Sequence, residues 1–494
     1  MTITASVLYD LVNCPQRVAL DAFGDKATRD PANAFVKLLW ERGSVFEKEA
    51  IGNLKTPYLD LSALEGEEKE RRTLDAIKRD EPLIYGGRIR AGDLVGVPDI
   101  LRKELGGYVP GDIKSGRGEE GGGDDDSDGK PKLHYAVQLA IYVDLLEQIG
   151  FSAGRRGFIW DVLGDEVTYD FTKPQGPKKP ETLWDEYQSA LAQARGILSK
   201  QIIPKGAYAS GCKLCHWYTH CTNELTIADD LTLIPFLGRS LRDTMQDTIP
   251  TIAAFAACNP EAYITKSKTA FKGLGADRMR VFHSRAVLLK DPAPTPFLRS
   301  AVMLPSAEIE LFFDIEVDPL RDFCYLHGIV ERNHGDNSAE KFVYFFAEKV
   351  TPEAERQAFA DAYTYLTSRA GVAIYYYSKY ERTIYRKLQR KFPDVCSEDD
   401  IEELFNPSRS IDLYFDVVFR ATEWPTRDHS IKTLAKYLGF GWRDVHPSGA
   451  ASIEWFDRWC RSGDQQVRQR ILDYNEDDCR ATRVLLDGIR AIDS

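Results

Sequence analysis

The chain has 494 residues, which is too long for one hydrophobic core, so two or three domains are expected. Its 43% hydrophobic and 28% charged residues are ordinary for a globular protein, and its net charge of −12 excludes nucleic-acid binding by overall positive charge. No run of about 18 apolar residues occurs, which argues against a membrane-spanning helix, and no G-x-x-x-x-G-K-[ST] loop points to an ATP-driven motor.

The N-terminal segment predicts a cytoplasmic protein that does not contact a membrane. "MTITASVLYDLVNCPQRVAL" lacks a basic stretch followed by an apolar one, so it is not a signal peptide. Nine cysteines without an export signal indicate reduced thiols that bind metal or are buried. Farther along, "ERGSVFEKEA" places Glu47 on a predicted helix, where its carboxylate can bind a metal ion.

Residues 83 to 114 contain three β-type runs, "LIYGGRIR", "LVGVPDILRK" and "GYVPGDIK". Asp99 lies in the second run, and Asp112 and Lys114 lie in the third, on neighbouring strands of a predicted hairpin. Residues two apart on a strand share a face, so Asp112 and Lys114 are expected to point together toward Asp99. Two carboxylates suit Mg²⁺ or Mn²⁺, and the lysine can orient an attacking water and offset charge in a transition state.

A Gly- and Asp-rich stretch follows, "SGRGEEGGGDDDSDGKPK", which cannot bury apolar area and is expected to be a disordered loop. The helix predicted next, "LHYAVQLAIYVDLLEQIG", carries Gln138 and Tyr142 four residues apart, hence on one face. Two more strands and the helix "ETLWDEYQSALAQARGILSK" complete an α/β unit that ends near Leu225.

These motifs, in this order, resemble the PD-(D/E)xK nucleases, and within them the RecB family. The literal Pro98-Asp99, the Asp112-to-Lys114 motif and the Gln138/Tyr142 pair carry the resemblance. It implies a restriction-endonuclease-like α/β domain over residues 1–225, with catalytic Asp99, Asp112, Lys114, Gln138 and Tyr142 and a metal bound by Glu47, Asp99 and Asp112. Many members have histidine where this chain has Glu47. Each motif taken singly also fits a solvated strand end or turn.

Three cysteines, Cys212, Cys215 and Cys221, follow with the spacing C-x2-C-x5-C, and a closed metal site needs a fourth ligand. His216 or His220 would complete a Cys₃His zinc site. Cys14 is the other candidate, and a lone N-terminal cysteine before such a trio resembles the iron-sulfur branch of the RecB-like nucleases, which includes CRISPR-associated enzymes. That resemblance implies a [4Fe-4S] cluster on four thiolates. Unligated, buried thiols are the third interpretation.

Residues 226–300 are predicted to form a helical linker domain. "FKGLG", with Gly273 and Gly275, resembles a helix-hairpin-helix, in which backbone N–H groups meet a DNA phosphate. Basic residues around it would strengthen such a contact, namely Lys272, Arg278, Arg280 and Arg285. A tight turn between helices is the alternative.

Residues 301–494 begin with strand patterns, and "LFFDIEVDP" places Asp314 and Glu316 two apart on an apolar strand. Burying two like charges side by side is costly without a cation, so the pair indicates a metal site. Glu381 opens a helix after a later strand, and Tyr474 and Asp478 share a helical face in "ILDYNEDDCRATRVLL".

The order D-x-E, aromatic-acid and Y-x-x-x-D resembles the tyrosine subclass of the DEDD exonucleases, which have an RNase H-like mixed-sheet fold. The resemblance implies two Mg²⁺ ions on Asp314, Glu316, Glu381 and Asp478, a water oriented by Tyr474, and 3′→5′ hydrolysis. The second motif usually supplies Asp and Asn, where this chain has Glu381 and Tyr377.

The whole chain is therefore predicted to be a multi-domain α/β nuclease that cuts DNA, at single strands or ends, with Mg²⁺ or Mn²⁺. A DNA-binding or adaptor protein with decayed catalytic centres, and a 3′→5′ RNA exonuclease, are the alternatives. Larger relatives continue into a helicase, so a motor would be a separate protein. CRISPR or repair proteins are the other expected partners.

Overall fold

The protein is described by a computed structural model, over residues 2–121 and 129–493, and divides into two compact units. One comprises Met1–Gly206 and Leu214–Cys221, and the other Ala207–Lys213 and Thr222–Ser494. The predicted domain boundaries near residues 225 and 300 stay predictions. Residues 122–128 of the predicted disordered loop lie outside the described residues. On either side of them, β8 (Glu119–Glu120) pairs with β9 (Lys130–Pro131).

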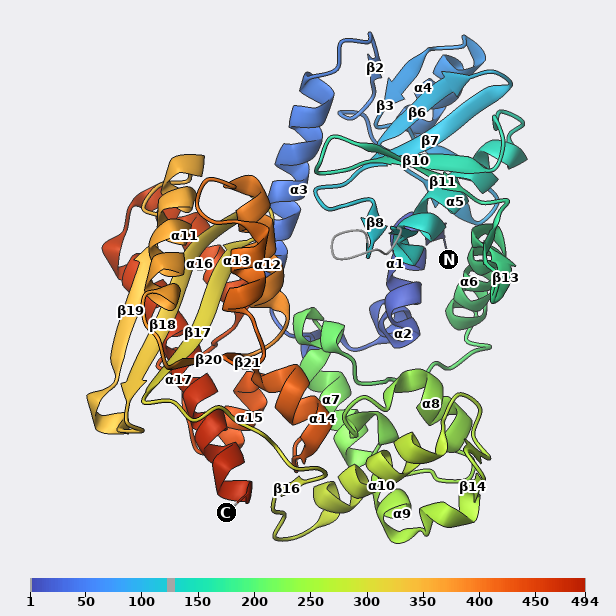
Figure 1. Ribbon diagram of the computed structural model, residues 1–494. Coiled ribbons are helices and arrows are strands. Elements are labelled where there is room, and N and C mark those ends of the chain that lie inside the picture. Colours follow the sequence, from blue (N-terminus) through green and yellow to red (C-terminus); the bar gives the residue numbers. More distant parts are fainter. Residues whose placement is uncertain (1, 122–128, 494) are drawn as a thin grey trace. The chain divides into compact units, whose positions relative to one another are not determined.

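The first unit is built on a six-stranded mixed sheet of order β11-β10-β7-β6-β3-β2 (Figure 1). β6 and β7 form the predicted hairpin, pairing antiparallel with Ile100 opposite Gly111, and β10 lies parallel to β7. The two runs expected at 83–103 each break, at the Gly86 turn (φ +66°) and before Pro98, so that β4 and β5 join β1 in a separate sheet. The strands are β1 (Ile3–Thr4), β2 (Leu59–Asp60), β3 (Leu83–Tyr85), β4 (Ile89–Ala91), β5 (Leu94–Gly96), β6 (Ile100–Glu104), β7 (Gly107–Ile113), β10 (Arg156–Trp160) and β11 (Glu166–Asp170).

Helix α5 (Leu133–Gln148) is the central helix of this unit. Nine of its residues are buried, because the sheet covers one side and α1 (Ala5–Asn13) and α6 (Leu183–Leu198) cover the other. Helix α3 (Ala34–Gly52) packs on the opposite face of the sheet. The remaining elements are α2 (Pro15–Phe23), α4 (Gly66–Lys78) and the hairpin of β12 (Pro174–Gly176) and β13 (Lys179–Thr182).

The second unit contains a five-stranded sheet of order β19-β18-β17-β20-β21. β17, β18 and β19 are antiparallel neighbours, whereas β20 and β21 run parallel to β17, which is the predicted mixed sheet. The strands are β17 (Ile309–Asp318), β18 (Phe323–Asn333), β19 (Lys341–Phe346), β20 (Val372–Tyr376) and β21 (Ser410–Asp412).

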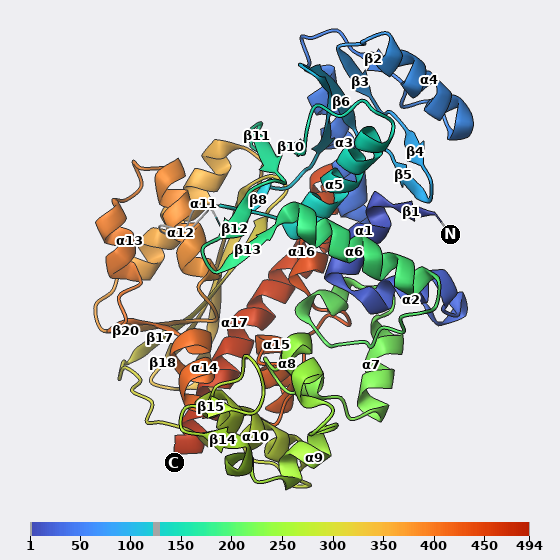
Figure 2. The same ribbon diagram turned by 90° about the vertical axis from the view of Figure 1, so that its right-hand side faces the viewer.

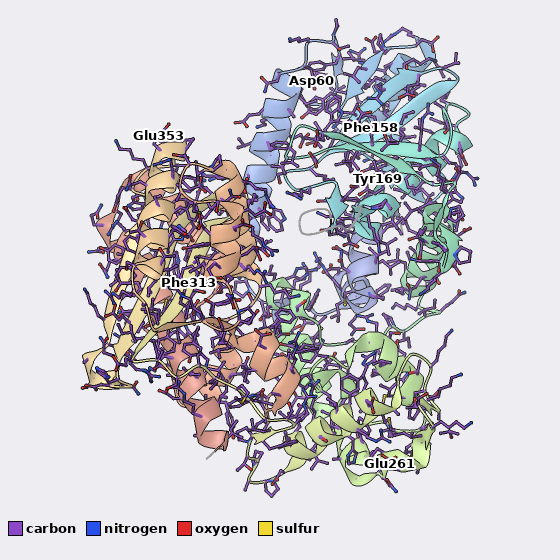
Figure 3. The ribbon with its side chains drawn as sticks, viewed as in Figure 1. Asp60, Phe158, Tyr169, Glu261, Phe313 and Glu353 are labelled. Atoms are coloured by element: carbon purple, nitrogen blue, oxygen red, sulfur yellow. The ribbon has the colours of Figure 1, made fainter. Side chains whose placement is uncertain are left out.

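Helices cover both faces of this sheet (Figures 1 and 2). Leu311, Phe313 and Ile315 of β17 pack with α11 (Pro352–Thr367), α12 (Tyr380–Lys391) and α13 (Glu398–Leu404), and Figure 3 labels Phe313 there. Phe312 points to the opposite face, where α17 (Gln465–Asp493) packs. Side chains alternate along a strand, so the side chains of residues 314 and 316 lie on the α17 face.

The other helices of this unit lie around the sheet or in the segment before it. They are α14 (Phe419–Ala421), α15 (Ile431–Tyr437) and α16 (Gly449–Ser462), the π-helical turn Leu413–Val418, α8 (Gly238–Met245), α9 (Ile252–Ala257) and α10 (Ala276–Lys290). Helix α7 (Tyr218–Ile227) begins in the first unit and enters the second at residue 222. Two small sheets add β14 (Ile264–Thr265) with β15 (Lys268–Thr269), and β16 (Phe297–Leu298) with β22 (Thr422–Glu423).

Two expectations for the segment before the sheet are wrong. Strand β15, and not a helix, precedes the turn at Gly273 and Gly275, so no helix-hairpin-helix forms there. Arg285, expected to meet DNA, is only 4% exposed and forms a two-pronged ion pair with Glu423, at 2.7 and 3.1 Å. A buried guanidinium needs such a partner, and this one is no longer available to a phosphate.

Candidate active sites

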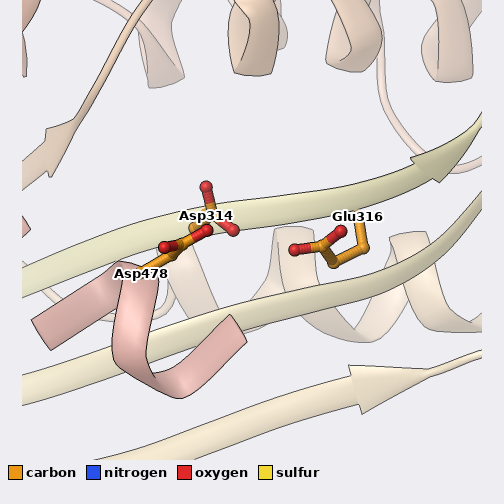
Figure 4. A group of neighbouring side chains, drawn as sticks. All are labelled: Asp314, Glu316 and Asp478. Carbon is orange, nitrogen blue, oxygen red and sulfur yellow. The ribbon is translucent and has the colours of Figure 1, made fainter. Parts of the chain in front are cut away.

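Three carboxylates meet on the α17 face of the second unit's sheet (Figure 4). Asp314 and Glu316 come from β17 and Asp478 comes from α17, and one oxygen of each lies within 4.8 Å of the others. Residues 314 and 316 share a strand face, and α17 crosses that face, which explains how a helix 160 residues away completes the group. The sequence predicts all three members.

Burial raises the pKa of Asp314 and of Glu316, and the charge of Asp478 is the largest further cause for both. Like charges this close cannot all ionise cheaply in a buried site. A divalent cation that prefers oxygen ligands would relieve this repulsion, so the donor set fits Mg²⁺ or Mn²⁺.

Asn475 holds Asp314 in place, which the sequence alone does not indicate. Its Nδ2 donates a 2.7 Å hydrogen bond to Asp314 Oδ2, and the residue is fully buried. Its amide packs against Gly328 of β18, where an added Cβ would lie 1.6 Å from Asn475 Oδ1. Glycine is therefore required opposite this asparagine. Hydrogen bonds of this kind, from a neighbouring side chain to a metal-binding carboxylate, fix the orientation of the carboxylate.

Lys432 and Trp442 contact Asp478 from the chain segments before α17. Lys432 Nζ lies 3.2 Å from both carboxylate oxygens of Asp478, and 2.9 Å from Tyr474 Oη. Trp442 Nε1 donates to Asp478 Oδ1 at 2.7 Å. Tyr474 is 2% exposed, on the same face of α17 as Asp478. Neither Lys432 nor Trp442 belongs to a sequence motif that could have indicated it.

Glu381, the predicted fourth carboxylate, lies outside the group of three. It is buried at the start of α12, where Ser378 Oγ donates to its Oε2 at 3.4 Å. Burial raises the pKa of Glu381 to about 8. Its charge still contributes to the raised pKa of Asp314, so the two are electrostatically coupled. The hydroxyl of Tyr377 donates a hydrogen bond to the backbone oxygen of His429.

The first unit brings together Asp99, Asp112 and Lys114 at the end of the β6–β7 hairpin. Lys114 Nζ lies 2.9 Å from Asp112 Oδ2, and the backbone N–H of Ile113 donates to Asp99 Oδ2 at 2.8 Å. Burial, and then the charge of Asp112, raises the pKa of Asp99. This is the geometry that the two-residue spacing predicts.

The other predicted residues of this unit surround the same hairpin end. Tyr142 is buried on α5, with its Oη 3.4 Å from Val97 O, and the charges of Asp112 and Asp99 help to raise its pKa. Gln138, one turn earlier, has a buried Oε1 without a hydrogen-bond partner among the described residues. Glu47 accepts a 2.8 Å hydrogen bond from Tyr85, and within the described part it does not form a three-carboxylate group with the two aspartates.

Comparison with known protein families agrees with both geometries. Residues 19–222 match the PD-(D/E)XK nuclease superfamily, and residues 311–489 match the RNase H superfamily. The chain carries two nuclease superfamily domains. The predicted fold class, a multi-domain α/β protein with a PD-(D/E)XK domain and an RNase H-like mixed-sheet domain, is confirmed. A search among curated proteins finds none that matches the chain.

Residues 214–221, which carry Cys215 and Cys221, belong to the first unit and contact α2. Asp21 of α2 accepts a hydrogen bond from Trp217 Nε1 at 2.9 Å and contacts His216 Nε2 at 2.8 Å. Cys14 is the residue directly before α2, and the contacts with this helix come from His216 and Trp217. The contact with Asp21 also engages one ring nitrogen of His216.

No helix in residues 2–121 and 129–493 is both long enough and apolar enough to cross a membrane. Two nuclease superfamily domains imply a nucleic-acid substrate.

Proposed function

We propose that this protein is a divalent-metal-dependent nuclease that hydrolyses DNA at single strands or ends, with the RNase H-like site acting as a 3′→5′ exonuclease. The carboxylate group of Asp314, Glu316 and Asp478 carries the proposal, because its members come from distant parts of the chain and meet at ligand distance. Mg²⁺ or Mn²⁺, when bound there, would polarise the scissile phosphate and activate a water.

The side chains around the carboxylates supply the rest of the chemistry. Tyr474 orients the attacking water through its hydroxyl, which Lys432 holds at 2.9 Å. Lys432 also offsets negative charge as it builds up on the phosphate in the transition state. Asn475 keeps Asp314 in its binding orientation through the 2.7 Å hydrogen bond. Glu381 is the fourth carboxylate of the site, acting on the ligands through its charge.

The PD-(D/E)XK domain provides a second site in the proposal. Asp99 and Asp112 would hold the metal, Glu47 would join them by releasing its hydrogen bond from Tyr85, and Lys114 would activate the water beside them. Gln138 and Tyr142 border the site from α5, and the unsatisfied Gln138 Oε1 is a group that a substrate can engage.

The proposed cofactor of the same domain is a [4Fe-4S] cluster on Cys14, Cys212, Cys215 and Cys221. Its support is the contact of residues 214–221 with α2 and the engagement of His216 by Asp21. Iron and sulfide analysis of anaerobically purified protein, with the visible absorption spectrum, tests it. A colourless, zinc-containing protein whose Cys14→Ser variant folds normally would instead indicate a Cys₃His site.

A nuclease assay tests the main proposal, with labelled single- and double-stranded DNA and RNA and with Mg²⁺ or Mn²⁺. The variants are Lys114→Ala, Asp314→Ala and the two combined. Each single variant is expected to remove one activity, separable by the ends that it produces, and the double variant is expected to be inactive. Cleavage that survives in the double variant would refute the assignment of both sites. RNA degraded in preference to DNA would favour the RNA exonuclease.

The second candidate is a DNA-binding protein without nuclease activity. The position of Glu381, outside the group of three carboxylates, favours it, since this motif departs from the usual aspartate. A wild-type protein that binds DNA but cuts no substrate with either metal would establish this candidate.

A further inference from the structure

A cavity of about 590 Å³ lies beside the RNase H-like site, entirely within the second unit. Its volume is within the range of roughly 300–1,000 Å³ that is typical of small-molecule sites. The walls come from the segment at 208–213, the turn that leads into α8, the end of β20 and the loop before α15. Nothing in the proposed chemistry uses this cavity.

Five side chains of the lining carry aromatic rings. They are Tyr208, Phe236, Tyr377, Tyr414 and His429. Phe236 is 47% exposed, and its ring is held by the buried Arg285 guanidinium, 5.2 Å from the ring centroid, and edge-on by His429 at 5.4 Å. Its φ of +66° lies in the left-handed region that non-glycine residues rarely adopt, so the surrounding structure fixes this ring at a conformational cost.

His429 is a buried polar side chain in the cavity wall. It is 2% exposed, and both ring nitrogens lack a partner within the described part of the chain. Burial, and then the charge of Arg285, lowers the pKa of His429 to about 3, so the ring is neutral and offers one donor and one acceptor. Buried polar groups are nearly always satisfied by protein or by ordered water, so this ring offers hydrogen-bonding capacity that a ligand in the cavity can use in place of water.

The cavity connects to the catalytic carboxylates through one residue. Ser378 lines it, with a φ of +131°, and donates to Glu381. Glu381 in turn acts on Asp314 through its charge. Ser378 thus borders both the cavity and Glu381, which is the predicted fourth carboxylate of the RNase H-like site.

The lining suits a flat ring better than a phosphate. Two cations contribute, Lys213 and Arg427, and Lys213 is paired with Asp428 at 3.4 Å. A phosphate would need several donors, whereas the cavity offers aromatic faces for stacking and a neutral imidazole for the polar edge of a base. Nucleic-acid-binding proteins hold unpaired bases by this combination of rings and flanking positive charge.

We propose that this cavity seats an unpaired nucleobase of the strand that is cut in the RNase H-like site. The inference rests on the proposed nuclease function and adds the site that recognises the single strand. A paired base cannot enter a pocket of this kind, so the site selects single strands and frayed ends.

The test uses the full-length Lys114→Ala/Asp314→Asn protein, which binds without cutting. Single-stranded DNA carries one 2-aminopurine at successive positions from its 3′ end, and fluorescence quenching reports stacking. Quenching is expected at one position, to be lost in Phe236→Ala and retained in the matched control Phe236→Tyr. Phe236→Ala is expected to weaken binding about tenfold. An abasic site at the same position should weaken binding equally, and combining the two should add nothing.

Fluorescence quenching that Phe236→Ala leaves intact would overturn the inference. Additive losses of affinity when Phe236→Ala is combined with the abasic site would also overturn it. So would a Phe236-dependent affinity for a free mononucleotide with unchanged oligonucleotide binding. Thermal unfolding verifies that the Phe236→Ala variant is folded. If it is not folded, the Tyr414→Ala variant is used in its place. If the protein binds no oligonucleotide, both the proposed nuclease function and the proposed nucleobase site are wrong. If the enzyme still cuts DNA with an unchanged KM after Phe236→Ala, only the proposed nucleobase site is wrong.

Discussion

The contact between Gly328 and Asn475 predicts that Gly328→Ala disables the RNase H-like site. The new methyl group would lie 1.6 Å from Asn475 Oδ1 and 2.8 Å from Asn475 Cγ, so the asparagine must move. Its movement breaks the 2.7 Å hydrogen bond to Asp314. Overpacking a core costs about 1–3 kcal/mol, and a hydrogen bond to a protonated carboxyl group contributes about 0.5–1.5 kcal/mol. We expect an unfolding free energy lower by about 2–4 kcal/mol and a cleavage rate lower by about 10–100-fold.

A double-mutant cycle isolates the cause. The Lys114→Ala background silences the other domain, and single-strand cleavage and chemical denaturation are measured for Gly328→Ala, Asn475→Ala and their combination. Asn475→Ala removes the amide that the methyl group meets, so Gly328→Ala is expected to cost little more in that background. Gly449→Ala is the control, because no atom lies within 4 Å of its added Cβ. Additive losses in the double variant would refute the steric argument.

Three further predictions follow from the same structure. Lys432→Met should lower kcat at the RNase H-like site about 10–100-fold. It should not raise the Mg²⁺ concentration needed for half-maximal activity, because this lysine competes with cations for Asp478. A kcat within twofold of the wild-type value would count against the role of Lys432. In metal-free protein the two β17 carboxylates, Asp314 and Glu316, hold protons that the unfolded chain releases, so the free energy of unfolding should fall as pH rises from about 4 toward 8. Mg²⁺ should therefore raise Tm more at pH 8 than at pH 5 in a fluorescence melt. Equal shifts of Tm at the two pH values would contradict this prediction. Arg285→Ala should cost about 1.5–3 kcal/mol in chemical denaturation, because it removes the two-pronged partner of the buried Glu423 and leaves only Arg299, at 2.9 Å, to balance its charge. Arg280→Ala, which removes an exposed pair, should cost less than about 1 kcal/mol, and similar costs for the two variants would argue against a buried pair.

Periodicity explains what could be predicted of the two sites. The two-residue spacing of Asp314 and Glu316 fixes a shared strand face, and the four-residue spacing of Tyr474 and Asp478 fixes a shared helix face. The hairpin at residues 100–113 likewise sets Asp99 beside Asp112. These relations depend only on local geometry, so they can be read without a structure.

Local spacing misled where long-range packing decides the outcome. The glycines at 273 and 275 have the pattern of a helical hairpin, yet the preceding residues pair as β15 with β14. Arg285 lies in a helix whose basic residues are typical of DNA binding, yet its side chain points inward to Glu423, 138 residues later in the chain. Burial of an ion pair depends on which surfaces meet, and no periodicity encodes that.

The sequence by itself determined the order of the elements, the mixed sheet and the carboxylate motifs of both nuclease superfamily domains, because these follow from backbone periods of two and 3.6 residues. Only the tertiary structure decided which side chains support those carboxylates. Asn475 beside Gly328, Lys432 on Asp478, and the ring-lined cavity at Phe236 and His429 each join segments far apart in the chain. Their contacts exist only once the sheet and its covering helices have packed.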